Sequence, residues 1–309
     1  MANTKLEGLV AAPVTAFDPD GTVNPDLIAL QAAALHANGV IAAFVNGTTG
    51  EGFSLTVEER KAIAERWVKT APADLKVIVH VAHTSAVATQ ELASHAANIG
   101  AWAVAEMGPI FFKPADVGSL VASVAKTAAS AGGLPYFYYH MPSMSGIDLP
   151  MIEFLRAAES DVPNLAGIKY TYEDLADYSL CSRYKGGKYD ILFGRDEMLL
   201  CSLVLGGRGV VGSTYNIMAP LYTQLIDAFD SGDLDRAREL QYLSVKVIRC
   251  LAGTGCFISA LKEVMKMIGL GVGSVRSPLA PISQECVAKL KSDLMELGFF
   301  EVCSRLPLT

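Results

Sequence analysis

Short apolar runs alternate along the chain with segments of helical periodicity. Eight of the runs have the length of buried strands, and they lie at residues 9–14, 42–46, 77–81, 101–107, 136–140, 166–170, 191–193 and 209–212. Strands that alternate with helices are typical of βαβ units and of a parallel sheet. Eight such units match the size of a (β/α)8 barrel, so the pattern predicts an α/β fold of the TIM-barrel type.

Capping signals mark the starts of several predicted helices. Thr56 opens the capping box T-V-E-E, and Arg60, Ala64 and Trp67 follow it at helical spacing. A second, alanine-rich helix is expected to open at Thr84. Helices therefore begin soon after the second and third predicted strands, as the barrel pattern requires.

The last part of the chain is helical without further strand candidates. Helical stretches lie at residues 233–251 and 286–297. We predict a catalytic barrel domain at residues 1–218 and a C-terminal helical extension at residues 219–309. The extension is expected to pack on the barrel and not to form an independent domain.

Composition and charge exclude several classes of protein. Half of the 309 residues are apolar, and the net charge of −7 gives no basic surface for nucleic acid or anionic lipid. No apolar run approaches the roughly 20 residues that a bilayer requires, and the first residues, MANTKLEGLV, do not resemble a signal peptide. The six scattered cysteines predict neither a disulfide framework nor a zinc site, and they favour a cytoplasmic location. His80 and His83 would lie on opposite faces of a strand, so no shared metal is expected.

The sixth apolar run, L-A-G-I-K-Y-T, contains Lys169. Lysine is almost never fully buried unless it is paired. One explanation is that the strand ends near Ile168 and that the side chain extends into solvent. The other is that desolvation favours the neutral amine, which then attacks carbonyl substrates. Because barrel chemistry takes place at the C-terminal ends of the strands, the position of Lys169 makes the two explanations equal alternatives.

Polar side chains also follow the second and fifth predicted strands. The loop N-G-T-T-G-E at residues 46–51 has backbone N–H groups and hydroxyls that can converge on an anion, although ordinary polar loops share this composition. Strand alternation places Tyr139 on the opposite face from Tyr138 and His140. A phenol beside a cationic lysine or iminium can have a lowered pKa and shuttle protons. A strand of packed aromatic residues is the alternative.

Two further motifs follow the seventh strand. Asp196 and Glu197 can accept hydrogen bonds from the hydroxyls of a polyol, or they can simply favour the start of a helix. The sequence G-R-G-V-V-G at residues 207–212 spells the dinucleotide fingerprint. A helical pattern precedes it, however, whereas the fingerprint requires a strand there. We therefore interpret it as the turn into the eighth strand, with Ser213 at the barrel mouth.

Together these motifs resemble those of the pyruvate-dependent class I aldolases and lyases, the family that includes N-acetylneuraminate lyase and dihydrodipicolinate synthase. The resemblance covers almost the whole chain, from the G-T-T-G-E loop through the Y-x-x-P and G-I-K strands to G-S-T-Y-N. It implies a (β/α)8 barrel with a helical C-terminal extension, usually in a homotetramer. It also implies small-molecule substrates, with no metal or organic cofactor.

The resemblance also implies roles for residues at the barrel mouth. Lys169 is implied to form the Schiff base, and Tyr139 to be the catalytic tyrosine. Thr48 and Thr49 fall where the family binds the pyruvyl carboxylate.

Within the family, two places imply the substrate. The synthases typically carry an arginine two residues after the Y-x-x-P proline, where this chain has Met144. The neuraminate lyases carry G-x-D-E after strand seven, and this chain matches it. The implied substrate-binding residues are Thr48, Thr49, Thr171, Gly194, Asp196, Glu197 and Ser213. The implied reaction is the reversible cleavage of N-acetylneuraminate, a sialic acid, to N-acetylmannosamine and pyruvate.

One stretch departs from the family pattern. Many members have tyrosines after strand four that relay protons between neighbouring subunits, but this chain has Phe111 and Phe112 there. The alternatives are an aldolase or synthase of the same family with another 2-oxo acid substrate, and a non-catalytic sugar-acid-binding protein. The presence of both Lys169 and Tyr139 argues against the binding protein, because binding alone needs neither.

Overall fold

The computed structural model describes residues 5–307, and its centre is a closed barrel of eight parallel strands. The strands are β1 (Gly8–Ala11), β2 (Ala42–Val45), β3 (Lys76–His80), β4 (Ala103–Met107), β5 (Tyr136–His140), β6 (Leu165–Tyr170), β7 (Asp190–Phe193) and β8 (Gly209–Gly212). Each strand pairs with the next, and β8 pairs with β1 to close the barrel. The predicted fold class is confirmed, and every predicted strand has its counterpart.

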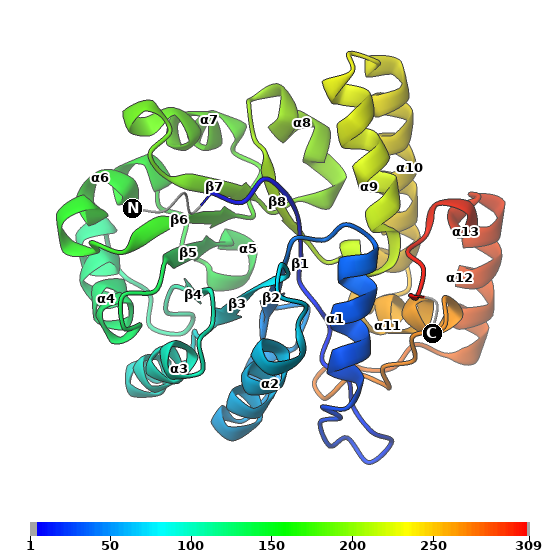
Figure 1. Cartoon of the computed structure of the whole chain (residues 1–309), viewed down its shortest axis with the longest axis horizontal. Helices are drawn as coiled ribbons and strands as arrows, with labels where there is room; N and C mark the ends of the chain where they lie inside the picture. Colours follow the sequence, from blue (N-terminus) through cyan, green and yellow to red (C-terminus); the bar gives the residue numbers. More distant parts are fainter. Residues whose placement is uncertain (1–4, 308–309) are drawn as a thin grey trace.

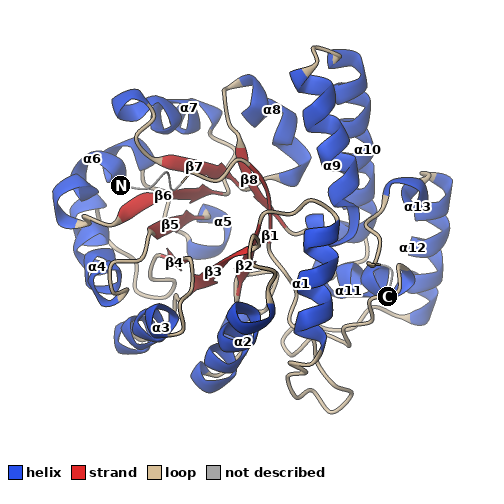
Figure 2. Cartoon of the chain, viewed as in Figure 1, coloured by secondary structure: helices blue, strands red, loops and turns tan. Residues whose placement is uncertain are grey.

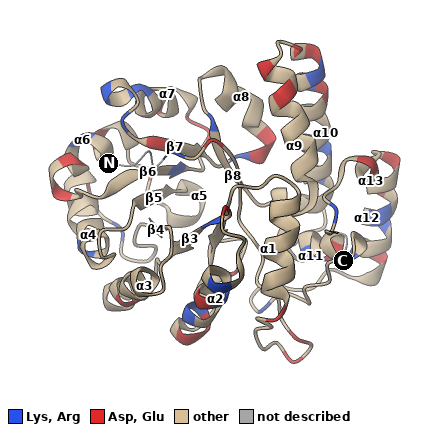
Figure 3. Cartoon of the chain, in the orientation of Figure 1, with Lys and Arg blue, Asp and Glu red and all other residues tan. Residues whose placement is uncertain are grey.

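Helices surround the barrel, as Figures 1 and 2 show. Those that follow the first seven strands are α1 (Leu27–Ala37), α2 (Val57–Thr70), α3 (Ala86–Asn98), α4 (Val117–Ser130), α5 (Pro142–Ser145), α6 (Met151–Asp161), α7 (Leu175–Arg183) and α8 (Leu199–Val204). Charged residues of both signs lie on the outer helices, for example on α2 (Figure 3).

The local signals largely locate the helix starts correctly. Thr56 caps α2 in a complete capping box, and Arg60, Ala64 and Trp67 are all buried on one side of this helix. The start of α3 differs from the prediction, because the side chain that accepts the capping hydrogen bond belongs to Ser85 and not to Thr84. Serine and threonine both cap helices well, so the sequence alone does not show which of these two adjacent residues is the N-cap.

Alternate side chains of the strands separate two apolar cores. Phe44, Ile78 and Phe137 belong to the core inside the barrel, whereas Tyr136 and Ile168 belong to the larger core between the barrel and the helices. The same alternation decides which side chains near the strand ends face the barrel axis.

The chain after β8 forms a helical layer on one side of the barrel. It consists of α9 (Tyr215–Asp230), α10 (Leu234–Ala252), α11 (Phe257–Met267), α12 (Gln284–Glu296) and α13 (Phe299–Val302). Figure 1 shows the last four helices gathered beside α9 and α1. The predicted boundary between residues 218 and 219 falls inside α9, next to Met218, whose backbone is not helical. The division into barrel and extension stays a prediction.

Three further predictions concern the start of the eighth strand, the cysteines and membrane-spanning helices. β8 begins at Gly209, inside the G-x-G-x-x-G stretch, and α8 precedes it, which confirms that this is not a dinucleotide fingerprint. All six cysteines are unpaired. Within residues 5–307, no single helix has the length and apolar composition to cross a membrane, although α10 and α11, bent by 112°, pass that test together.

Candidate active site

A pocket of about 460 Å³ opens where the barrel strands end. Its lining includes all nine residues that the sequence singled out, namely Thr48, Thr49, Tyr139, Lys169, Thr171, Gly194, Asp196, Glu197 and Ser213. These residues follow or end five different strands. The closed barrel is therefore what brings them together.

Lys169 and Tyr139 lie side by side at the base of this pocket. They are direct neighbours across β5 and β6. The lysine Nζ lies 4.1 Å from the centre of the Tyr139 ring and 3.9 Å from the centre of the Phe44 ring. Lys169 is only 4% exposed, so its side chain stays inside the barrel mouth and does not extend into solvent.

Burial changes the acid–base behaviour of Lys169. Removal from water lowers the pKa of its amine to about 7, and the negative charge of Asp196 opposes the change only in part. A substantial fraction of the molecules therefore carries a neutral amine near pH 7, whereas an ordinary lysine is almost wholly protonated there. A neutral amine is the form that attacks a carbonyl carbon.

The Tyr139 hydroxyl is also held inside the pocket. It lies 3.5 Å from the Thr48 Oγ1 and donates to the Met141 Sδ at 3.0 Å. Burial raises the pKa of Tyr139, although the nearby hydroxyls of Thr48 and Thr171 act in the opposite direction. The lowered pKa that a neighbouring cation can give a phenol is not found in this state, because desolvation outweighs the opposing hydroxyls and the charge of Arg195.

The loop at residues 46–51 forms a tight turn beside Tyr139. The Glu51 N–H donates to the Thr48 carbonyl at 3.0 Å, and the Gly52 N–H donates to the Gly47 carbonyl at 3.1 Å. A Cβ at Gly52 would lie 2.0 Å from the Asn46 carbonyl oxygen, so no larger residue fits there. The turn presents Thr48 and Thr49 to the pocket.

Asp196 lies on another wall of the pocket, and one of its carboxylate oxygens is engaged with the protein. Its Oδ2 accepts from the Thr214 N–H at 2.9 Å and from the Thr214 hydroxyl at 2.5 Å, and Tyr222 contacts that hydroxyl at 2.8 Å. Burial raises the pKa of Asp196 to about 6, with the Thr214 bonds opposing the change. One oxygen of Asp196 is thus held in the wall of the pocket, and Glu197 is less buried than Asp196.

Thr171, Gly194 and Ser213 complete this wall. The Thr171 Oγ1 is buried and has no hydrogen-bond partner in the protein, so a bound ligand could supply one. A Cβ at Gly194 would lie 2.0 Å from that oxygen, which explains why glycine follows β7. Ser213 lines the pocket directly after β8.

Sequence analysis missed part of the lining. Arg195 lines the pocket and forms ion pairs with Glu173 and Glu197, and its position between two recognised residues was the available signal. The helical extension also contributes lining residues, namely Ile248, Gly255, Cys256, Phe257, Ile258 and Leu279. No motif marked these residues, because an amphipathic helix does not reveal which surface it covers.

Three exposed apolar side chains lie where other family members have polar ones. Phe111 and Phe112 stand in place of the tyrosines that follow strand four, and Met144 stands in place of the synthase arginine. Phe111 and Phe112 are 77% and 85% exposed, and their rings contact each other edge to face. Met144 is also exposed, and it lines the pocket where the synthases would have an arginine.

The fold is a (β/α)8 barrel, and its pocket lies at the C-terminal ends of the strands, where the enzymes of this fold have their active sites. The chain belongs to the dihydrodipicolinate synthetase family, whose model matches residues 5–297. The resemblance seen in the motifs is thereby confirmed.

Relatives within this family are similar over nearly the whole chain. The N-acetylneuraminate lyase of Mus musculus is 39% identical over 299 residues, which cover 96% of this chain and 93% of the relative. The solved Proteus mirabilis N-acetylneuraminate lyase is 42% identical, with a TM-score of 0.93 over 96% of this chain and 100% of that one. The sialic acid aldolase of Ruminococcus gnavus, solved as a catalytic lysine mutant, is 27% identical, with a TM-score of 0.90 over 96% of this chain and 99% of that one.

Proposed function

We propose that this protein is an N-acetylneuraminate lyase, which reversibly cleaves N-acetylneuraminate to N-acetylmannosamine and pyruvate. It is a carbon–carbon lyase of the class I aldolase type. The observation that carries the proposal is the buried amine of Lys169, with its pKa lowered to about 7, beside Tyr139 in a pocket large enough for a sugar acid. The identity with relatives of this name supports the choice of substrate.

Lys169 supplies the covalent step of the reaction. Its neutral amine attacks the C2 ketone of the open-chain sugar acid, and loss of water gives an iminium. The C3–C4 bond then breaks, and its electron pair moves into the iminium to form an enamine. The chemistry needs no metal or organic cofactor, because the iminium itself is the electron sink.

Tyr139 moves the proton that this cleavage releases. The C4 hydroxyl gives up its proton as the aldehyde forms, and the phenol relays it through the substrate carboxylate. A proton returns to C3 of the enamine, and water hydrolyses the resulting imine to pyruvate and free Lys169. The raised pKa of Tyr139 fits a phenol that remains protonated between turnovers.

The two walls of the pocket bind the two ends of the substrate. Thr48 and Thr49 hold the pyruvyl carboxylate next to Lys169. Glu197 and Ser213 accept hydrogen bonds from hydroxyls at the far end of the sugar. The buried Thr171 hydroxyl, which lacks a partner in the protein, makes a further contact of this kind.

A synthase that condenses pyruvate with a short semialdehyde is the nearest alternative. Met144 disfavours it, because a thioether cannot pair with the carboxylate of a second substrate. An aldolase for another deoxy-sugar acid would share the same amine and phenol, so only a comparison of substrates separates it from the proposal.

Borohydride trapping tests the reaction class. The protein is incubated with pyruvate and sodium borohydride, and the labelled residue is identified by mass spectrometry. We expect a single adduct on Lys169. Labelling of another lysine, with turnover retained in Lys169→Ala, would overturn the mechanism.

The Glu197→Ala variant tests the choice of substrate. We expect condensation of pyruvate with N-acetylmannosamine to weaken much more than trapping of pyruvate alone, because the carboxylate meets only the sugar end. Glu285→Ala, which removes an exposed carboxylate on α12, is the matched control. Parallel losses in both assays would mean that Glu197 supports the fold, and a wild-type preference for aspartate semialdehyde would overturn the neuraminate assignment.

Assembly and location are part of the same proposal. The homotetramer is what the family resemblance implies, and the exposed pair Phe111 and Phe112 offers apolar surface for a subunit contact. The scattered, unpaired cysteines favour a reducing, cytoplasmic compartment. Light scattering of the purified protein tests the assembly, and a monomer at micromolar concentration would contradict it.

A further inference from the structure

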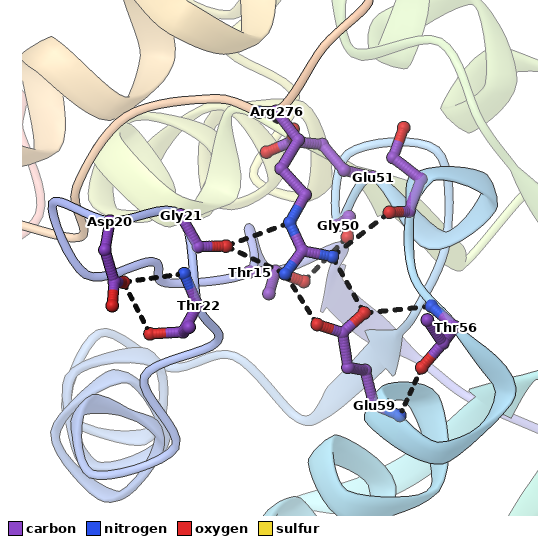
Figure 4. A network of polar contacts seen from close by, with 10 residues as sticks. Thr15, Asp20, Gly21, Thr22, Gly50, Glu51, Thr56, Glu59 and Arg276 are labelled. Atoms are coloured by element: carbon purple, nitrogen blue, oxygen red, sulfur yellow. Dashed lines mark hydrogen bonds and ion pairs between the residues drawn. The ribbon is translucent and has the colours of Figure 1, made fainter.

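A network of charged groups next to the pocket joins the loop at residues 46–51 to the helical extension (Figure 4). We name Glu51, Glu59, Lys262 and Arg276 the clamp. The Lys262 Nζ donates to the Glu51 Oε1 at 2.7 Å, and these two side chains are 1% and 0% exposed. The Arg276 main-chain N–H donates to the other Glu51 oxygen at 2.8 Å. Both oxygens of the loop carboxylate are therefore held by residues of the extension.

Arg276 ties the clamp to two further segments. Its guanidinium donates to both Glu59 oxygens, at 2.5 and 2.7 Å, and to the Gly21 carbonyl at 2.8 and 3.1 Å. It also donates to the Ser54 carbonyl at 3.2 Å. In Figure 4 the side chain reaches from the extension to the loop around Gly21 and to the start of α2. Such a planar, bidentate pairing fixes orientation as well as distance.

The aromatic ring of Phe17 supports both cations from one side. The Lys262 Nζ lies 4.4 Å and the Arg276 guanidinium carbon 4.6 Å from the ring centre. Lys262 also donates to the Ser274 carbonyl at 2.6 Å. The Lys262 ammonium and the Arg276 guanidinium thus each have several defined partners in the protein.

A buried ion pair is a poor means of adding stability, because both charges lose their hydration. What it does provide is a fixed geometry, provided that each lone pair and proton has a partner. Here the fixed group is Glu51, whose N–H donates to the Thr48 carbonyl. Residue 51 has a left-handed backbone (φ 54°), which a side chain tolerates only when its surroundings hold it.

We propose that Glu51, Lys262 and Arg276 are positioning residues for 2-oxo acid binding. They hold the turn at residues 46–51 so that Thr48 and Thr49 meet the carboxylate of the 2-oxo acid. None of the three belongs to the pocket lining among residues 5–307, so they act through the turn and not on the ligand. This inference rests on the proposed function, and it adds that the substrate carboxylate site depends on residues more than 200 positions further along the chain.

Two variants test the clamp. Lys262→Met leaves the Glu51 carboxylate buried without its ion pair, and Glu51→Gln removes the charge while keeping the shape of the side chain. Lys289→Met is the matched control, because Lys289 is an exposed lysine of the extension that pairs with Asp293 on the surface. Each variant is measured for borohydride trapping at a series of pyruvate concentrations, for the KM of N-acetylmannosamine, and for amide hydrogen exchange in residues 46–52.

We expect the pyruvate concentration for half-maximal trapping to rise about 10- to 100-fold in Lys262→Met, the size of effect caused by a misplacement of about 1 Å. The maximal trapping rate and the KM of the amino sugar should stay close to wild type, and amides 46–52 should exchange faster. Glu51→Gln should show a smaller change in the same direction, and Lys289→Met none. If the maximal rate falls while the pyruvate dependence is unchanged, the clamp only stabilises the fold and the inference is wrong.

The hydrogen-exchange readout separates this inference from the proposed function. If wild-type protein forms no pyruvate adduct, the proposed function fails whatever the clamp does. Faster exchange confined to residues 46–52 in Lys262→Met would then still support a positioned turn. Unchanged exchange there, in either variant that folds, would overturn the positioning role.

Discussion

Lys169 and Lys262 are both buried; Lys169 lies at the base of the pocket, and Lys262 lies in the clamp, on α11. Burial lowers the pKa of both amines. At Lys262 the touching carboxylate of Glu51 opposes this change, and the amine is held as an ion pair. At Lys169 the opposing charge belongs to Asp196, whose carboxylate is held by Thr214 instead.

The difference between these two charge partners shows that one fold can use a buried lysine in two ways. A desolvated lysine with a partner in contact stays charged and fixes geometry. A desolvated lysine whose nearest acid is held elsewhere gives up its proton near neutral pH and becomes a nucleophile. The position of the partner therefore decides between structure and chemistry, and substitutions at the two sites should have opposite signatures.

Lys169→Met should give the largest effect on activity. Without the amine no imine can form, and we expect kcat for N-acetylneuraminate to fall by roughly 10³-fold or more. The variant should be at least as stable as wild type, because an amine is no longer desolvated. Steady-state assays and urea unfolding measure both quantities on one preparation, and turnover close to that of wild type would contradict the comparison.

Lys262→Met should give the largest effect on stability. It leaves Glu51 as an unpaired buried charge, and we expect the free energy of unfolding to fall by about 3–5 kcal/mol. Combining it with Glu51→Gln should recover part of that loss, which a double-mutant cycle in urea measures. If the single variant is as stable as wild type, the pair is solvated and the contrast with Lys169 disappears.

Tyr139→Phe should separate the chemistry from imine formation. The change removes one hydroxyl and little volume, so we expect pyruvate trapping to continue while kcat falls by roughly 10²-fold. Trapping rate and kcat are compared on the same sample. An unchanged kcat would reduce Tyr139 to a packing residue beside Lys169.

The pH dependence of trapping should show the smallest but most diagnostic effect. The reactive amine of Lys169 is lost as the pH falls through its pKa of about 7. The initial trapping rate should therefore fall about tenfold for each pH unit well below 7 and level off above 8. A rate that keeps rising up to pH 10 would show that Lys169 has the pKa of an ordinary lysine.

The sequence predicted the fold and the barrel-derived site well because both follow from local patterns. Eight apolar runs defined the strands, and a barrel gathers whatever follows their C-terminal ends. Thr48, Tyr139, Lys169 and Glu197 could therefore be predicted to lie together although they are far apart in sequence. The structure places all of them in one pocket.

The rest depended on contacts that no local pattern contains. Phe257 and Leu279 line the pocket only because the extension docks on the mouth, and amphipathic periodicity does not say where a helix docks. Glu51 and Lys262 are separated by 211 residues, and although Glu51 ends the G-T-T-G-E motif, nothing in either segment indicates that the two side chains meet. The raised pKa of Tyr139 could not be predicted either, because it follows from the burial of the phenol in the complete fold.

The clamp also has a consequence for the order in which the protein is made. A ribosome delivers all eight strands, with Lys169 and Tyr139, before it reaches Lys262 and Arg276. A growing chain can therefore close its barrel while the turn at residues 46–51 still lacks both of the residues that hold its carboxylate. The residues proposed to position the substrate turn are thus made after Lys169, the proposed nucleophile, which is already part of the nascent barrel.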